Sequence, residues 1–288
     1  MLGNIDYDAQ PGKSAPAPAG STQPTRALPR GFSHFDRLPG TADEVDAITR
    51  LYQSDFGREG ITTLAQTEAS KRSFLAEAGQ HRYLHLATHG FFVEEKLPTP
   101  ALLGQRGAER FGEMLRGPQT AEVQAGLLSG LALAGANHVG QAADALAGSD
   151  SDDGILTAEE LGTQNLDGVQ LVVLSACETG LGKAAAGEGL LGLQRAFQSA
   201  GARTVVASLW SVPDEETRML MEEFYTNLWR RKQGALDSLR QAQLAMLHCE
   251  GRAGRLRGAE RDIEDDHSGH TRLSPRYWAA FVLSGDWR

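Results

Sequence analysis

The chain has 288 residues, of which 41% are hydrophobic and 23% charged, proportions that suit a globular protein with a packed core. The formal net charge of −9 at pH 7 disfavours direct binding to nucleic acid or to an anionic membrane, since both require a basic surface. Two cysteines are too few for a disulfide framework, and neither a secretory signal nor a bilayer-length apolar run occurs, so we expect a soluble cytoplasmic protein.

The first 37 residues predict a disordered linker. They are rich in Pro, Ala and Gly, and six of the eleven prolines of the chain lie within the first 39 positions. Such a segment cannot bury enough apolar surface to offset the entropy that it loses on ordering. A linker at this point suggests that another module precedes it, so we expect the chain to be the C-terminal part of a larger protein.

Residues 38–288 predict one α/β domain. Thr41 is a candidate N-cap for a helix that carries Val45, Ile48 and Leu51 on one face. Further strands are expected at 61–64, 83–88, 171–176, 204–209 and 278–283, and further helices at 68–78, 188–200, 214–231 and 235–248. Strands that alternate with helices indicate an α/β sandwich with a mainly parallel central sheet. The polar segment 104–126 and the charged segment 250–274 are expected to be mobile surface insertions.

Two of the predicted strands end in residues that can perform nucleophilic catalysis. Strand 83–88 is followed by His89 and Gly90, and strand 171–176 is followed by Cys177. Because ligand sites of parallel sheets lie at the carboxyl ends of the strands, neighbouring strands would bring the imidazole and the thiol together. The imidazole would manage protons for the thiol, and the amide N–H groups of Gly90 and Cys177 could hold an oxyanion. The alternative is a buried structural cysteine and a histidine that is satisfied within the fold.

Several segments resemble the CHAT domain, a caspase-like domain that is often found behind tetratricopeptide repeats. They are LPGTADEV (38–45), YLHLATHGFF (83–92), DGILTAEEL (153–161), LVVLSACETGLG (171–182), GEGLLGLQRAFQSAGARTVVASLW (187–210) and YWAAFVLSGDW (277–287). The resemblance implies a caspase-like α/β/α sandwich with a mainly parallel central sheet flanked by helices. It also implies catalytic roles for His89 and Cys177 and an oxyanion hole at Gly90 and Cys177. We expect neither a cofactor nor a metal. The insertions at 104–126 and 250–274 depart from the family pattern, which bears on substrate access and regulation.

Other residues near these motifs have competing interpretations. His85 lies four positions before His89 on the same predicted strand and would share its face, but its deeper position favours a packing role. Cys249 closes a helix without a catalytic partner and is expected to be structural. Asp214 and Trp210 follow the strand after the nucleophile, and the resemblance makes them candidates for an S1 pocket in which Asp214 faces a basic P1 side chain. The alternative is that Asp214 caps helix 214–231.

Three further patterns are weaker. The GxGxxG motif at 187–192 begins about ten residues after strand 171–176, whereas a dinucleotide site needs it in the turn directly after a strand. Residues 149–161 resemble an EF-hand loop, with Gly154 at the sixth position and Glu160 at the twelfth, but Ser149 and Ser151 stand where a calcium loop needs carboxylates. The DGILTAEEL segment of the CHAT resemblance explains these residues without a metal, although some caspase-like enzymes respond to calcium. The chain has no GxSxG motif, and the HxxxH pattern at 85–89 lacks the glutamate of a zinc protease.

These residues predict a cysteine endopeptidase that cleaves a protein or peptide substrate. The resemblance implies that an N-terminal repeat module or a regulatory protein gates the activity, with a role in stress or antiviral defence. Neither nucleic acid nor a membrane is expected as a direct partner. The alternative function is a non-proteolytic, caspase-like interaction module.

Overall fold

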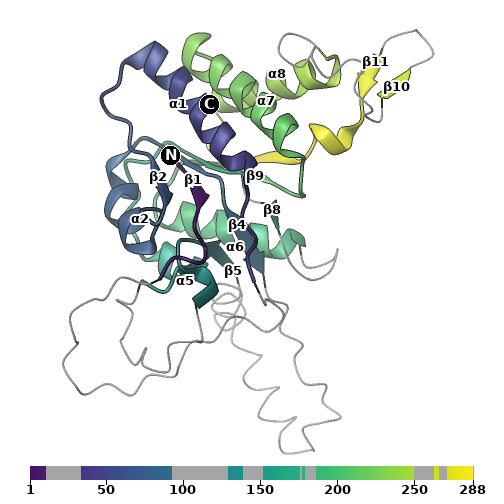
Figure 1. Ribbon diagram of the computed structural model, residues 1–288. Helices are drawn as coiled ribbons and strands as arrows, with labels where there is room; N and C mark the ends of the chain where they lie inside the picture. Colours follow the sequence, from purple (N-terminus) through teal and green to yellow (C-terminus); the bar gives the residue numbers. More distant parts are fainter. Residues whose placement is uncertain are drawn as a thin grey trace, which may run out of the picture.

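A computed structural model describes eight stretches of the chain, and every structural statement below concerns these stretches (Figure 1). They are residues 1–10, 34–92, 129–138, 152–175, 177–178, 186–249, 263–265 and 271–287.

The centre of the fold is a six-stranded sheet with the order β12-β9-β7-β3-β1-β2. Neighbouring strands are parallel, apart from β12, which is antiparallel to β9. The strands are β1 (Leu2–Ile5), β2 (Leu64–Gln66), β3 (Tyr83–Leu86), β7 (Leu171–Leu174), β9 (Thr204–Ser208) and β12 (Phe281–Gly285). The mainly parallel sheet agrees with the prediction from the sequence.

Helices cover both faces of this sheet (Figure 1). They are α1 (Gly40–Phe56), α2 (Lys71–Glu77), α5 (Ala158–Gly162), α6 (Ala186–Ser199), α7 (Asp214–Tyr225) and α8 (Ala235–Leu247). Shorter helical turns are η1 (Ala78–Gln80), η2 (Ala136–His138), η3 (Thr226–Arg230) and η5 (Pro275–Tyr277). In Figure 1, α1, α7 and α8 lie on one face of the sheet, while α2, α5 and α6 lie on the other. The fold is therefore the caspase-like α/β/α sandwich that the sequence predicts.

Strand β7 shows how the sequence builds two cores. Its four residues are all buried, and successive side chains of a strand point to opposite faces of the sheet. Val172 and Leu174 belong to the core on the side of α2 and α6, whereas Leu171 and Val173 belong to the core under α1, α7 and α8. An unbroken apolar run is what a strand needs when both of its faces are covered.

A second sheet of four strands extends from the central one, in the order β6-β5-β4-β8. Its strands are β4 (His89–Phe92), β5 (Ser129–Ala132), β6 (Ile155–Thr157) and β8 (Cys177–Glu178). The sequence analysis missed β5 and β6. They are only four and three residues long, and the residues of β5 include Ser, Gly and Ala, which carry little strand signal.

The expectation of a linker over residues 1–37 is wrong at both of its ends. Strand β1 lies inside the central sheet between β3 and β2, and the side chains of Tyr7 and Phe35 are buried at 1% and 2% exposure. The composition of the whole segment concealed the apolar residues Leu2, Ile5 and Tyr7, which precede the Pro-rich part. Residues 11–33 lie outside the described residues.

Several expected boundaries also need correction. Thr41 does not cap α1, because the helix begins at Gly40 with Pro39 as N-cap; the Thr41 hydroxyl instead accepts a hydrogen bond from the Asn4 amide (2.9 Å). The strand expected at 61–64 is β2, at Leu64–Gln66. The segment expected to be a charged insertion at 250–274 contains the antiparallel hairpin of β10 (Ile263–Asp265) and β11 (Thr271–Leu273). The insertion expected at 104–126 lies outside the described residues.

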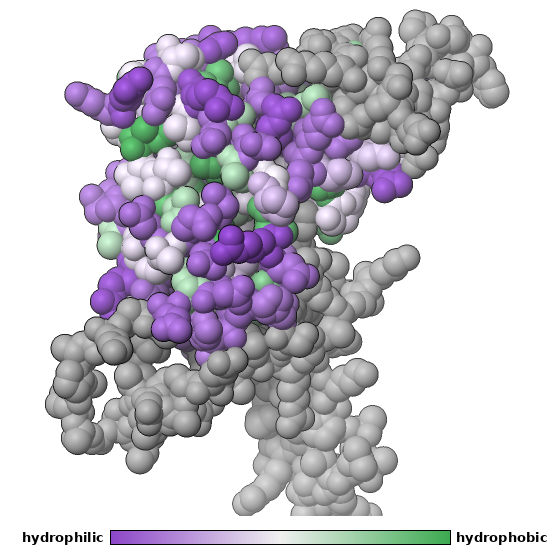
Figure 2. Space-filling view, in the orientation of Figure 1, coloured by the Kyte–Doolittle hydropathy of each residue, from purple (hydrophilic) through white to green (hydrophobic). Residues whose placement is uncertain are grey.

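Polar side chains dominate the face of the molecule seen in Figure 2, where apolar residues form small and separate patches. Among the described residues, each helix is too short or too polar to cross a membrane.

Candidate active site

The two predicted catalytic residues are register partners on neighbouring strands. Strand β4 begins at His89 and β8 begins at Cys177, and the parallel pairing aligns His89 with Cys177 and Gly90 with Glu178. The chain reaches this pairing directly from the central sheet, because β3 precedes β4, β7 precedes β8, and β3 and β7 are themselves paired. The backbone positions of His89 and Cys177 therefore lie about 4.8 Å apart, the usual spacing of neighbouring strands.

The imidazole of His89 is buried, with 3% of the residue exposed. Its Nε2 lies 2.7 Å from the carbonyl oxygen of Asp36. A carbonyl oxygen can only accept, so Nε2 carries the hydrogen and the lone pair of the neutral ring is on Nδ1. Burial lowers the pKa of His89 below 6.5, against the opposing effects of the Asp36 carbonyl and the Asp36 charge. At neutral pH this imidazole is therefore uncharged and able to accept a proton.

Two aromatic rings from the N-terminal part of the chain pack against this imidazole. The Tyr7 ring centroid lies 5.1 Å from that of His89, and the Phe35 ring centroid lies 5.6 Å from it. The Tyr7 hydroxyl is hydrogen-bonded to the Thr88 side chain at 3.1 Å. Burial raises the pKa of Tyr7 to about 12, although hydrogen bonds with Thr88 and the His89 backbone act in the opposite direction. The segment expected to be a linker thus supplies the surroundings of His89.

A buried carboxylate connects the two strands that lead to the candidate site. Glu44, on the first turns of α1, lies 3.1 Å through Oε1 from Nε2 of His85 on β3. Its Oε2 accepts a hydrogen bond of 3.1 Å from the hydroxyl of Ser175, which directly follows β7. On the other side of the imidazole, Nδ1 of His85 lies 3.1 Å from the hydroxyl of Tyr225. Burial and the nearby Glu44 charge raise the pKa of Tyr225 well above 10, so its hydroxyl stays protonated.

The sequence analysis expected His85 and His89 to share one face of a single strand, and this expectation is wrong. Strand β3 ends at Leu86, and His89 begins β4 in the second sheet. His85 is paired with Val173 in the central sheet and is 1% exposed. Its contacts with Glu44 and Tyr225 make it part of the buried network beneath the candidate site.

A family model for the CHAT domain matches residues 5–286. The chain belongs to the CHAT domain family. CHAT domains are related to caspase-like peptidases, in agreement with the α/β/α architecture. The chain is also similar to the mouse and human proteins named Tetratricopeptide repeat protein 28, with 30% identity over 197 residues and 27% over 194 residues, respectively. Each match covers 66% of this chain but only 7% of the relative, so the chain spans a small part of these relatives.

Four of the six segments that carry the resemblance to the CHAT domain form the paired strands or the elements that lead to them. YLHLATHGFF forms β3 and β4, and LVVLSACETGLG contributes β7 and β8. LPGTADEV forms the start of α1, including Glu44. DGILTAEEL forms β6 and α5, and β6 is joined to β4 through β5.

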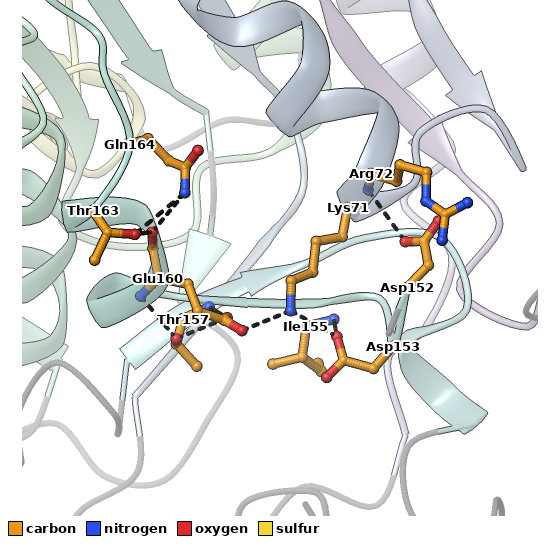
Figure 3. Close-up of polar contacts among 9 residues, drawn as sticks. All are labelled: Lys71, Arg72, Asp152, Asp153, Ile155, Thr157, Glu160, Thr163 and Gln164. Carbon is orange, nitrogen blue, oxygen red and sulfur yellow. Dashed lines mark hydrogen bonds and ion pairs between the residues drawn. The ribbon is translucent and has the colours of Figure 1, made fainter. Parts of the chain in front are cut away.

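A buried lysine holds the DGILTAEEL segment against α2 (Figure 3). The Lys71 ammonium lies 3.2 Å from the Asp153 carboxylate and 2.8 Å from the Glu160 carboxylate. Glu160 also forms a capping box with Thr157 at the start of α5. The ammonium of Lys71 therefore lies between two carboxylates of the segment that resembles an EF-hand loop. The serines of that pattern, Ser149 and Ser151, lie outside the described residues.

The two S1 candidates have different contacts. Asp214 is exposed and is the first residue of α7; the N-cap is Pro213, so the expectation that Asp214 caps this helix is wrong. Its side chain packs against Gly40, where an added Cβ would lie 2.1 Å from the Asp214 carboxyl group. Trp210 is 38% exposed, and its Nε1 donates to the Arg276 carbonyl oxygen at 3.0 Å. Asp214 therefore contacts the segment that begins α1, four residues after Asp36.

Two other predictions concern residues outside the paired strands. The GxGxxG motif at 187–192 lies within α6 rather than in the turn after a strand, so it lacks the structure that a dinucleotide site requires. Cys249 follows α8 and is 1% exposed within the core under α7 and α8. Its burial agrees with the structural role expected from the sequence.

Sequence reasoning missed the residues that surround His89. Tyr7, Phe35 and Asp36 come from two segments that no motif links to the active site. Asp36 acts through its backbone carbonyl, so its residue type gave no signal. The aromatic residues within the Pro-rich segment were the one sign that could have identified it as part of the fold.

Proposed function

We propose that this CHAT domain is a cysteine endopeptidase in which Cys177 is the nucleophile and His89 is the general base and acid. The observation that carries the proposal is the register of β4 and β8, which pairs these two residues. The neutral, buried imidazole gives further support, since a general base must be uncharged at the pH at which it works.

The reaction follows from the tautomer of His89. Nδ1 takes the proton of the Cys177 thiol while the sulfur attacks the carbonyl carbon of the scissile peptide bond. The resulting imidazolium returns that proton to the leaving amine as the C–N bond breaks, which leaves a thioester on Cys177. A water molecule, deprotonated by His89, then hydrolyses the thioester and restores the thiol. The Asp36 carbonyl stabilises the imidazolium because it accepts a hydrogen bond from Nε2.

The amide N–H groups of Gly90 and Cys177 are the proposed oxyanion donors. They belong to neighbouring register positions of β4 and β8, so they could converge on one oxygen atom. A glycine next to the base also leaves room for the backbone of a substrate. Each such donor typically contributes about 10²–10³-fold to kcat.

Asp214 and Trp210 are the proposed S1 residues, with a preference for Arg or Lys at P1. The exposure of Asp214 and its contact with the start of α1 support this role. An exposed carboxylate can make a charge-assisted hydrogen bond with a basic side chain. The indole of Trp210 could pack against the aliphatic part of that side chain.

The proposed regulator is a tetratricopeptide repeat module or another protein that binds near this domain. The names of the two relatives support an association with such repeats. The same names favour a second candidate function, a non-proteolytic interaction module within a repeat protein. The two functions differ in whether Cys177 reacts selectively.

Cleavage of a peptide library by the wild-type chain, Cys177→Ala and His89→Ala tests the proposal. We expect cleavage by the wild type only, and a double variant no worse than either single variant, because the two residues act as one unit. Cleavage that survives Cys177→Ala would reject the thiol mechanism. Absence of cleavage by the wild type, together with equal reactivity of Cys177 with and without His89, would favour the interaction module.

A further inference from the structure

Two short segments pack against the imidazole of His89, and the side chain of Asn137 is hydrogen-bonded to both of them. Tyr7 comes from the segment after β1, while Phe35 and Asp36 come from the segment before α1. Asn137, on η2, contacts both segments. Its Oδ1 accepts a hydrogen bond of 2.7 Å from the Phe35 amide, and its Nδ2 donates to the Phe35 carbonyl oxygen at 3.1 Å.

The same side chain also reaches the segment that carries Tyr7. Nδ2 of Asn137 donates a second hydrogen bond, of 2.9 Å, to the carboxylate of Asp8. The backbone amide of Asn137 donates to the Tyr7 carbonyl oxygen at 3.0 Å. Asn137 is therefore hydrogen-bonded to both segments that contact the His89 imidazole, at Phe35, the residue before Asp36, and at Tyr7 and Asp8.

We propose that Asn137 is a positioning residue for His89. It fixes Phe35, and through Phe35 it holds the Asp36 carbonyl at the distance at which Nε2 of His89 can donate to it. That hydrogen bond selects the tautomer that leaves the Nδ1 lone pair for the Cys177 proton. This inference rests on the proposed function for its effect on catalysis, but not for its effect on the imidazole itself.

The chemistry of the amide explains why this position carries asparagine. The backbone of Phe35 offers a donor, its N–H group, and an acceptor, its carbonyl oxygen, and the asparagine amide presents an acceptor and a donor that match them. Aspartate has the same shape but cannot donate, so its second oxygen would face the Phe35 carbonyl and the Asp8 carboxylate. Alanine removes all three side-chain bonds. Both variants therefore release the segment that carries Asp36, by different means.

The experiment compares Asn137→Ala and Asn137→Asp with a control that loses the same kind of bond elsewhere. In Gln243→Ala, the lost side-chain amide is one that donates to the carbonyl oxygens of Trp278 (3.4 Å) and Phe281 (2.9 Å), beside β12 and away from His89. We expect both Asn137 variants to lower kcat about 10²-fold with little change in KM, because small displacements of catalytic groups have effects of this size. Gln243→Ala should lower the melting temperature about as much as the Asn137 variants do, while its kcat stays within twofold of the wild-type value.

A second readout does not need proteolysis. In a chain labelled with ¹⁵N-histidine, long-range ¹H–¹⁵N spectra distinguish the two imidazole tautomers, and His89→Gln identifies the signal of His89 among the eight histidines. We expect the wild type and Gln243→Ala to show the single tautomer with hydrogen on Nε2. Both Asn137 variants should show exchange between tautomers.

The outcomes separate this inference from the proposed function. If the wild type cleaves no peptide but the tautomer signal changes as expected, the proposed function fails and the positioning role stands. If the Asn137 variants keep the single tautomer, or keep kcat within twofold, the positioning role is rejected whether or not the chain is a protease. A loss of kcat that is equally large in Gln243→Ala would also reject it, because the loss would then follow stability alone.

Discussion

The buried carboxylate of Glu44 should be a principal source of stability for β3 and β7, the strands that lead to His89 and Cys177. Glu44 is 3% exposed, with one oxygen 3.1 Å from His85 and the other 3.1 Å from Ser175. Glu44→Ala would leave a buried imidazole and a buried hydroxyl without this partner, and would also open a cavity. Each buried polar group that loses its partner costs about 1–3 kcal/mol, and the cavity left by the removed side chain adds to this cost.

We therefore expect Glu44→Ala to lower the free energy of unfolding by about 3–5 kcal/mol, a large part of the 5–15 kcal/mol typical of natural domains. Glu44→Gln keeps the shape and one acceptor, so it should cost about 1–2 kcal/mol. For a domain of this size, the alanine variant should melt about 6–20 °C below the wild type. Glu59→Ala, in an exposed turn, is the matched control and should change the unfolding free energy by less than about 0.5 kcal/mol.

Urea unfolding followed by far-ultraviolet circular dichroism gives these free energies, and calorimetry gives the melting temperatures. The order expected is Glu59→Ala, then Glu44→Gln, then Glu44→Ala, from least to most destabilised. A decrease of less than about 1 kcal/mol in the unfolding free energy of Glu44→Ala would refute the reasoning, because two buried polar groups lose their partner in this variant.

Three further predictions concern other groups. Lys71→Met should lower the free energy of unfolding by about 3 kcal/mol, because it leaves the Asp153 and Glu160 carboxylates without their cation. A urea unfolding midpoint equal to that of the wild type would contradict this. Because burial lowers the pKa of His89, the unfolded chain binds the His89 proton more tightly than the folded chain does. The stability of the wild type relative to His89→Gln should therefore be greatest above pH 6.5 and decrease as the pH falls through the lowered pKa. A difference that does not depend on pH would exclude this. Asp214→Asn should erase a preference for Arg over uncharged P1 residues of tenfold or more in kcat/KM, and a library profile led by apolar or acidic P1 residues would retire the pocket role.

The sequence predicted the frame of the fold because its signals there are strong and local. The apolar runs of β7 and β9 and the helices between strands have the lengths and periods expected of a parallel sheet with two covered faces. The motifs around His89 and Cys177 lie at the ends of such strands, so their proximity followed from topology alone. The detail that differed is that His89 opens a new strand of a second sheet rather than closing β3.

The surroundings of His89 could not be predicted because they depend on contacts between distant segments. The Asp36 carbonyl is a backbone group, and any residue type at this position could supply it. Asn137 lies on a short turn 102 positions from Phe35, and a single asparagine in a turn is far more often a local turn former. The start of the chain was misjudged because the Pro-rich residues that follow β1 dominated its average composition.

The most direct test of the His89–Cys177 dyad is the labelling rate of each cysteine by peptidyl acyloxymethyl ketones with mixed P1 residues, measured by mass spectrometry. The chain has only two cysteines, so the buried Cys249 serves as an internal reference. We expect rapid labelling of Cys177 in the wild type and a labelling rate at least about 10²-fold lower in His89→Ala. Cys249 should not be labelled in either folded protein. Equal labelling rates of Cys177 with and without His89 would contradict a catalytic dyad.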